Sequence, residues 1–357
     1  MSRFATVQLS ALTPYTPGEQ PKKGERLIKL NTNENPFPPG PAVRAALSDS
    51  AVDALRLYPD PDCSQLRQAV AESYGLLPEN VFVGNGSDEV LAFIFKGLCP
   101  QGAAFPDITY GFYPVFADMF QIPYREIPLQ NDFSISVDDF AGISSALFIA
   151  NPNAPTGLAL PVSSIRRLLE QSPERLVVVD EAYVDFGAES SVPLLREYDN
   201  LLIVQTLSKS RQLAGARVGL ALGGRELIRD LETLKFSFNP YSVNALALAA
   251  AAASFRDKEW FDEHCLSIRE NREYLSSGLR GLGFSLTDSL ANFVFAAPPA
   301  GLSGEEYFTR LRRRGIVVRW FNKPRISNYV RITVGLRDQL DALLQATGEI
   351  MKERGLI

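Results

Sequence analysis

Residues 201–223 read LLIVQTLSKSRQLAGARVGLALG, a stretch with strand character at both ends and polar residues between them. The runs 201–205 and 217–223 are rich in aliphatic residues, as buried strands are. Lys209 stands among small hydroxyl residues where the first strand ends. Such a lysine is either a surface residue near a turn or an amine held at a strand end for chemistry. The remainder of the sequence has to discriminate between the two.

The same alternation of strand and helix patterns extends through the middle of the chain. Further apolar strands are expected at 81–84, 146–151 and 176–180, and helical patterns follow at 87–98, 161–172 and 225–236. Continuous apolar strands separated by helices predict an α/β fold with a parallel sheet that is covered on both faces. Ligands of such sheets bind at the carboxyl ends of the strands.

The C-terminal part of the chain has a different pattern. A long polar helix is expected at about 257–281, followed by short strands, a helix and a closing helix, which is typical of a smaller α+β domain with antiparallel strands. The proline-rich start predicts an extended arm rather than a core element. We therefore expect an arm, with part of the small domain, at 1–40, a large domain at 41–260 and a small domain at 261–357.

Composition excludes several classes of function. Of the 357 residues 46% are hydrophobic and 22% charged, as in globular domains, and a net charge of −5 gives no basic field for nucleic acid. No secretory signal and no membrane-spanning run is evident. Three cysteines without CxxC spacing argue against a disulfide framework or a zinc site and favour the reducing cytoplasm. The single histidine, His264, lies in a helical pattern and is interpreted as a helix-surface or interhelix residue, so proton transfer must use another base.

Three local patterns could serve one ligand. Asp180 ends an apolar strand, where a carboxylate is costly to bury without a cationic partner. The turn VFVGNGSDEVL at 81–91 opens a helix near Gly86, whose free N–H groups suit a phosphate. Lys209 could bond to an aldehyde, and Arg217 could bind a phosphate. A lysine for an aldehyde, a carboxylate for a ring nitrogen and a site for a phosphate are together what pyridoxal 5′-phosphate requires. Each pattern alone is also compatible with an ordinary turn or cap.

Seven motifs in order carry a resemblance to a known family. They are YPD, GNGSDE, TYGFY, NPNAPTG, VVVDEAYVDF, TLSKSRQLAGARVG and YVRITVG, and they extend over essentially the whole chain. In this set the chain resembles the fold-type I pyridoxal-phosphate aminotransferases, and within them the histidinol-phosphate aminotransferase branch. The resemblance implies a mostly parallel central sheet sandwiched by helices, with a smaller α+β domain.

The resemblance also implies roles for individual residues. Lys209 would bond to the cofactor aldehyde and act as the general acid and base, Asp180 would face the ring nitrogen, and Tyr183 would hydrogen-bond the 3′-oxygen. Tyr110 would stack on the ring. Tyr58 would reach the cofactor phosphate of a neighbouring subunit, which makes a homodimer part of the site. The remaining phosphate contacts would be Ser87, Asp88, Thr206, Ser208 and Arg217.

One position departs from the family pattern. The family has two adjacent asparagines before PTG, of which the second contacts the 3′-oxygen, but here that position is Ala154. Either Asn153 or Asn151 takes the role, or Tyr183 carries it alone.

For the substrate, the resemblance implies anion contacts from Arg331 and Arg319, with Tyr15 as a further phosphate contact and Asn33 as a site residue in the arm. The expected reaction transfers the amino group of L-histidinol phosphate to 2-oxoglutarate in histidine biosynthesis, giving imidazole-acetol phosphate and glutamate. An aromatic amino acid aminotransferase and a lyase similar to threonine-phosphate decarboxylase remain alternatives. The expected partners are the small-molecule amino donor and 2-oxoglutarate. Neither nucleic acid nor a membrane is expected as a partner.

Overall fold

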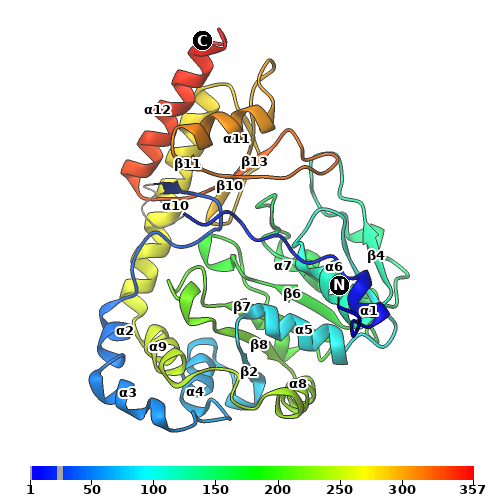
Figure 1. The fold of residues 1–357 in the computed structure, drawn as a ribbon. Coiled ribbons are helices and arrows are strands. Elements are labelled where there is room, and N and C mark those ends of the chain that lie inside the picture. Colours follow the sequence, from blue (N-terminus) through cyan, green and yellow to red (C-terminus); the bar gives the residue numbers. More distant parts are fainter. Residues whose placement is uncertain (1, 22–26) are drawn as a thin grey trace.

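A seven-stranded sheet forms the centre of the computed structural model, which describes residues 2–21 and 27–357 (Figure 1). Its strand order is β2-β8-β7-β6-β5-β3-β4. β8 is antiparallel to both of its neighbours, and the other strands pair in parallel, so the sheet is mostly parallel as expected. The bounds are β2 Val81–Gly84, β3 Ala103–Pro106, β4 Tyr124–Ile127, β5 Ala146–Ala150, β6 Val177–Asp180, β7 Leu201–Thr206 and β8 Gly219–Gly223. The sequence pattern had not predicted β3 and β4.

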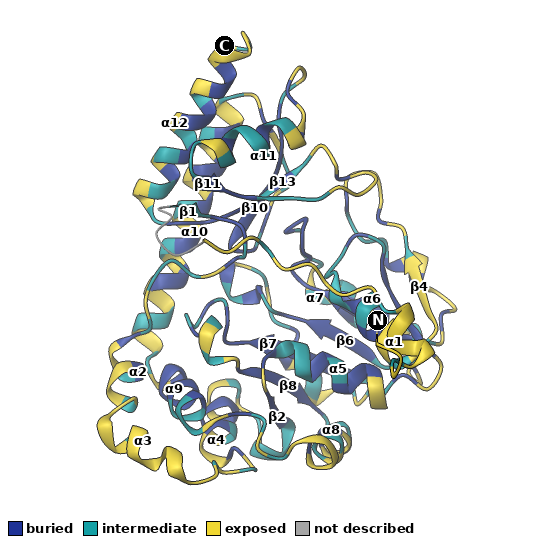
Figure 2. Ribbon diagram, in the orientation of Figure 1, coloured by how far each residue is buried: buried dark blue, intermediate teal, exposed yellow. Residues whose placement is uncertain are grey.

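Helices cover both faces of this sheet because successive residues of each buried strand point to opposite sides. Val177 and Val179 pack in one apolar cluster, whereas Val178 packs in another. The first cluster is covered by α2 (Pro41–Ala46), α4 (Ser64–Tyr74), α7 (Val162–Glu170) and α9 (Ala245–Arg256). The second is covered by α5 (Ser87–Gly97), α6 (Phe112–Phe120) and α8 (Arg225–Phe238). Figure 2 shows the strands as the buried centre of this layer, except for the edge strand β4, which is exposed.

A second, smaller layer lies at the other end of the molecule. Its four-stranded sheet has the order β12-β13-β10-β9, and all its pairs are antiparallel, as the sequence predicted. The bounds are β9 Ser285–Leu286, β10 Phe293–Ala297, β12 Arg319–Trp320 and β13 Val330–Thr333. The helices packed with it are α10 (Lys258–Gly281), α11 (Gly304–Arg313) and α12 (Arg337–Glu353). α10 extends from the large layer into the small one (Figure 1).

Short elements complete the chain. Two short helices, α1 (Val7–Ala11) and α3 (Asp49–Asp53), are largely exposed (Figure 2). The 3₁₀ turns are η1 Ala54–Arg56, η2 Pro78–Asn80, η3 Val137–Phe140, η4 Val184–Phe186, η5 Val192–Arg196 and η6 Ala214–Ala216.

The N-terminal arm agrees with its sequence-based prediction over residues 12–21, which form no helix or strand and are mostly exposed, but differs from it farther along the chain. Met1 and residues 22–26 of the predicted arm lie outside the described residues. Leu30, Asn31 and Asn33 are buried, so this part of the arm is a core element. The reason is a long-range pairing, since β1 (Ile28–Lys29) runs parallel to β11 (Ile316–Val317) and thereby satisfies its backbone hydrogen bonds. Proline content alone could not reveal that partner.

The start of β8 packs directly on the start of α5, backbone against backbone. A Cβ atom placed on Gly219 would come within 2.2 Å of the Ser87 nitrogen and 2.3 Å of the Gly86 carbonyl carbon. Backbone atoms cannot swing aside as the end of a flexible side chain can. Glycine at 219 therefore fixes the position of the α5 N-terminus.

We predict that Gly219→Ala lowers the free energy of unfolding by about 2 kcal/mol, because overpacking forces backbone shifts. The matched control is Gly215→Ala in η6, where a Cβ atom would meet nothing within 4 Å. That control should change the free energy of unfolding by less than about 0.5 kcal/mol. Urea denaturation of both variants measures the difference. Equal stability of the two variants would contradict the close backbone contact.

Candidate active site

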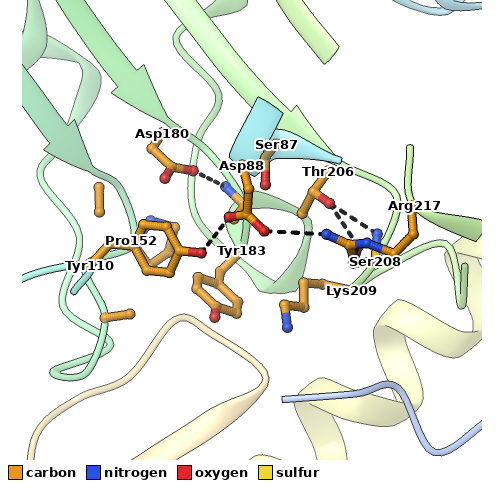
Figure 3. Close-up of a pocket in the computed structure, with 13 residues that line it drawn as sticks. Ser87, Asp88, Tyr110, Pro152, Asp180, Tyr183, Thr206, Ser208, Lys209 and Arg217 are labelled. Carbon is orange, nitrogen blue, oxygen red and sulfur yellow. Dashed lines mark hydrogen bonds and ion pairs between the residues drawn. The ribbon is translucent and has the colours of Figure 1, made fainter. Parts of the chain in front are cut away.

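A cavity of about 110 Å³ opens at the carboxyl ends of β5, β6 and β7 (Figure 3). This is the edge where parallel α/β sheets bind ligands. It gathers most of the residues that the sequence nominated, from segments far apart in the chain. Its lining consists of Ser87, Asp88, Tyr110, Ala150, Pro152, Ala154, Asp180, Ala182, Tyr183, Thr206, Ser208, Lys209 and Arg217.

Lys209 follows the end of β7 and lies on the cavity wall (Figure 3). Burial, with a further contribution from the nearby positive charge of Arg331, lowers the pKa of its ammonium group to about 8. Its Nζ donates a hydrogen bond to the carbonyl oxygen of Thr32 in the arm, at 3.1 Å. A lysine in this state has a substantial neutral fraction near neutral pH, which is the form that attacks carbonyl groups.

Asp180 is the last residue of β6 and is buried. The hydroxyl of Tyr113 donates to its Oδ2 at 3.0 Å, and the Ala182 N–H donates to Oδ1 at 3.2 Å. Burial raises the pKa of this carboxyl to about 6. Among the described residues Asp180 forms no salt bridge, so this wall of the cavity suits a cationic N–H of a ligand.

Tyr113 was missed by the sequence analysis. It lies in α6, three residues after Tyr110, and is fully buried. The motif TYGFYP contains Tyr113, but Tyr110 lies before the start of α6, so helical spacing does not connect the two tyrosines. Nothing in the local pattern indicated that Tyr113 meets the end of β6.

An anion-binding corner lies at the N-terminus of α5. The N-cap residue Gly86 has a φ of +83° and makes no side-chain cap, so the first N–H groups of the helix lack that partner. The Arg217 guanidinium lies close above Gly86, where a Cβ atom would come within 2.6 Å of it. Arg217 donates to the hydroxyl of Ser208 at 3.3 Å, and Thr206 donates to the same hydroxyl at 3.0 Å. Glycine at 86 therefore leaves room for the Arg217 guanidinium, which lies beside the N–H groups at the start of α5 as a further donor to an anion.

Asp88 connects the anion-binding corner to Tyr110 on the wall of the cavity. Its Oδ1 accepts a hydrogen bond from the Tyr110 hydroxyl at 2.6 Å, and its Oδ2 pairs with Arg217 at 3.2 Å. Figure 3 shows Tyr110 and Tyr183 on the same side of the cavity as Asp88. The ring of Tyr110 is thereby fixed in orientation by its hydroxyl.

The asparagines before PTG lie behind the cavity wall. Asn153 accepts from Thr109 and donates to the Ile108 carbonyl and to Thr156, so its side chain is fully engaged in the loop. Asn151 exchanges two hydrogen bonds with the backbone of Leu160. Neither asparagine lines the cavity, whereas Ala154 and Tyr183 do.

The arm and the small sheet contribute a second group of polar residues. Asn33 is buried and donates to the Tyr183 hydroxyl at 3.0 Å. Arg331 donates to the Asn31 carbonyl at 3.0 Å, and its Nε is buried without a hydrogen-bond partner among the described residues. Burial lowers the pKa of this guanidinium.

Arg331 and Arg319 are direct partners across the antiparallel β13–β12 pair. Like charges placed opposite each other in a sheet are destabilising unless an anion lies between or beside them. Arg319 also donates to the carbonyl oxygens of Thr16 and Pro17, next to Tyr15, whose ring stacks on Phe112 at 4.3 Å. Neither arginine nor Tyr15 lines the cavity described above.

Tyr58 lies apart from all of these residues in the single chain. Its side chain is 83% exposed, and its ring stacks on Tyr241 with centroids 4.6 Å apart. An exposed tyrosine in this position has no contact with the cavity of its own chain.

Other chemistries find little support in the described part of the chain. His264 is buried in α10, where its ring stacks on Trp260 and meets the edge of Phe37. Within residues 2–21 and 27–357, no group of three or more histidine, cysteine or acidic side chains could hold a metal ion. No helix in these ranges combines the length and apolar character needed to cross a membrane.

Comparison with known proteins supports the same assignment of family. The family model described as "Aminotransferase class I and II" matches residues 25–346. The histidinol-phosphate aminotransferase of Acinetobacter baylyi is 51% identical over 347 residues, with 96% of each chain covered. Histidinol-phosphate aminotransferase 1 of Bradyrhizobium diazoefficiens is 50% identical, with 98% of this chain and 100% of the relative covered.

A solved structure agrees on the fold. The histidinol-phosphate aminotransferase of Sinorhizobium meliloti, in complex with pyridoxal-5′-phosphate, superposes with a TM-score of 0.89 at 23% identity, covering 99% of this chain and 98% of the other. The fold, the match to the family model and the identity over nearly the full length agree. The chain belongs to the class I and II aminotransferase family and, within it, to the histidinol-phosphate aminotransferases.

Proposed function

We propose that this chain is a pyridoxal 5′-phosphate-dependent enzyme that transfers the amino group of L-histidinol phosphate to 2-oxoglutarate. The products are imidazole-acetol phosphate and L-glutamate, and the pathway is histidine biosynthesis. The observation that carries the proposal is one cavity whose walls present a half-buried lysine, a buried carboxylate that forms no salt bridge with the described residues, and an anion-binding corner. Relatives of about half-identical sequence carry the corresponding name.

The residues present fit the cofactor at its ring nitrogen and at its phosphate. Asp180 offers an acceptor to a protonated ring nitrogen, and Tyr113 and the Ala182 N–H hold that carboxylate in place. Arg217, Ser208 and the N–H groups at the start of α5 offer donors to a phosphate. Bound there, pyridoxal phosphate supplies an electron-withdrawing ring that stabilises negative charge at the substrate Cα.

Lys209 has two tasks in this proposal. Its amine would hold the cofactor through the aldehyde carbon until a substrate amine takes that place. As a free amine, with a pKa lowered towards neutrality, Lys209 would accept and return the proton at the substrate Cα. The Thr32 carbonyl accepts a hydrogen bond from Lys209 and so keeps the amine on the substrate side. His264 is not required for proton transfer.

The second set of residues binds the substrate. Tyr183, held by Asn33, takes the contact with the cofactor 3′-oxygen alone, because Asn151 and Asn153 are engaged in their own loop. Arg331 and Arg319, as direct cross-strand partners, bind the phosphate of histidinol phosphate in one half-reaction and carboxylate in the other. Tyr15 lies beside Thr16, which Arg319 contacts, and would close over the same anion.

The proposed assembly is a homodimer in which Tyr58 reaches the cofactor phosphate of the partner subunit. Two features support it. Tyr58 is too exposed for a packing role in its own chain, and Leu47, Val52, Leu55 and Leu57 around it are exposed apolar residues.

Two further proposals concern organisation and location. We infer a division into an arm with part of the small domain (1–40), a large domain (41–260) and a small domain (261–357), in keeping with the separate apolar clusters of the two sheets. Three free, buried cysteines are in keeping with a cytoplasmic location.

A panel of amino donors with 2-oxoglutarate tests the reaction. We expect kcat/KM for histidinol phosphate to exceed that for tyrosine by about tenfold or more, because the paired arginines gain charge-assisted hydrogen bonds to phosphate. Glutamate formation measures transamination. Equal values for tyrosine would identify an aromatic amino acid aminotransferase instead, and release of carbon dioxide from threonine phosphate would identify a lyase.

The pH dependence of cofactor attachment tests Lys209. Only the neutral amine attacks the aldehyde, so the rate at which the apo-protein bonds to pyridoxal phosphate should rise about tenfold per pH unit below the lysine pKa and level off above it. The midpoint should lie at about pH 8. Absorbance of the lysine-bound cofactor measures the rate.

Two substitutions should move that midpoint in opposite directions. The charged groups facing Lys209 are Arg331 and Arg217, which lower its pKa, and Glu34 and Asp88, which raise it. Arg331→Gln should therefore raise the midpoint, and the matched variant Glu34→Gln should lower it. A flat profile, or shifts in the same direction, would show that Lys209 is not the attacking amine.

A further inference from the structure

Lys235 occupies a position in α8 where the helical pattern calls for an apolar residue. It follows Ile228 and Leu231 on the buried stripe of the helix, and its relative exposure is 1%. Lysine is almost never fully buried in proteins unless it is paired, because its ammonium group loses hydration. A buried ammonium in this place therefore has to be compensated by the groups that it contacts.

The hydrogen bonds of the Lys235 ammonium go to the loop before α4. Lys235 Nζ donates to the Pro61 carbonyl at 2.9 Å and to the Cys63 Sγ at 3.5 Å. The same Nζ lies over the ring of Phe82 in β2, 5.8 Å from the ring centroid. Lys235 thus ties residues 61–63 to α8 and to the edge of the central sheet.

A second clamp holds the same loop from its exposed side. Asp60 accepts from the Asp62 N–H at 3.0 Å and from the Ser64 N–H, at the start of α4, at 2.8 Å. The Cys63 backbone has a φ of +52°, a conformation that needs such support in a residue with a side chain. Residues 60–63 therefore have one defined conformation, held by Asp60 outside and Lys235 inside.

Tyr58 stands two residues before this clamped loop. Its ring stacks on Tyr241, which follows the end of α8, and Lys235 lies in the last turn of α8. Tyr58 and Lys235 are therefore both near the C-terminal end of this helix. Tyr58 does not line the cavity of its own chain, and its ring is mostly exposed.

We propose that Lys235 is a positioning residue for the active site of the partner subunit: by holding the Pro61 carbonyl it fixes the direction in which Tyr58 projects. This inference rests on the shared site of the proposed function. Lys235 itself contacts neither substrate nor cofactor, and its effect is exerted on the other subunit.

Mixed dimers of differently tagged subunits test this directly. One subunit carries Lys209→Ala, so cofactor bonds only in the other, whose cavity would receive Tyr58 from the Lys209→Ala subunit. Lys235→Met is then placed either on the Lys209→Ala subunit, in trans to the working site, or on the subunit that keeps Lys209, in cis. Methionine keeps the length and apolar stem but removes the ammonium.

In trans, Lys235→Met should raise the dissociation constant for pyridoxal phosphate by about tenfold, the effect of one lost hydrogen bond to a charged group. In cis it should leave that constant unchanged. Absorbance of the lysine-bound cofactor is the readout, and it does not depend on turnover. A general loss of structure would act in cis and in trans alike, and that result would overturn the inference.

Reference variants separate the possible failures. Lys352→Met, at an exposed position of α12, should change nothing in either arrangement. Tyr58→Phe should raise the dissociation constant in trans only. If Tyr58→Phe has no effect in trans, both the shared site and this inference are wrong. If Tyr58→Phe acts in trans but Lys235→Met does not, only this inference is wrong. If Lys235→Met subunits do not assemble, Asp60→Ala on the exposed side of the loop decides, with a smaller trans effect expected.

Discussion

The site depends on keeping a half-buried amine and a buried carboxylate in one cavity without letting them neutralise each other. Asp180 ends β6 and Lys209 follows the end of the neighbouring strand β7, yet each is held by other partners. Lys209 donates to the Thr32 carbonyl, and Asp180 accepts from Tyr113 and the Ala182 N–H. Burial shifts the pKa of both groups towards neutrality, to about 8 and about 6. A ligand that carries an aldehyde and a protonated ring nitrogen can bond to the Lys209 amine and hydrogen-bond to the Asp180 carboxylate at the same time.

The rest of the molecule supports this separation. The sheet places its carboxyl ends at one edge, and the close contact of Gly219 with the start of α5 sets the anion corner beside them. The arm adds Thr32 and Asn33 from the opposite side, because β1 is fixed to β11 of the small layer. The arm thus brings part of the small layer to the cavity, and the proposed substrate contacts Arg319 and Arg331 lie on strands β12 and β13 of the same layer.

Sequence alone could predict what is encoded locally. Apolar runs ending in Asp180 and Thr206, and a glycine turn opening a helix at Gly86, indicate strand ends and a phosphate site without any knowledge of tertiary contacts. Tyr113 on Asp180, the burial of Asn33 and the Arg319–Arg331 pairing depend on contacts between distant segments. The engagement of Asn153 within its loop likewise depends on side-chain geometry that spacing does not encode.

The most direct test of this account is Asp180→Asn, which removes the charge and keeps the shape. The account predicts that the rate at which glutamate discharges the lysine-bound cofactor falls by about a hundredfold or more, whereas the dissociation constant for pyridoxal phosphate changes by less than about tenfold. Stopped-flow absorbance measures the first quantity, and titration of the apo-protein measures the second. A retained rate, or losses of rate and affinity of equal size, would contradict the assignment of Asp180 to the ring nitrogen.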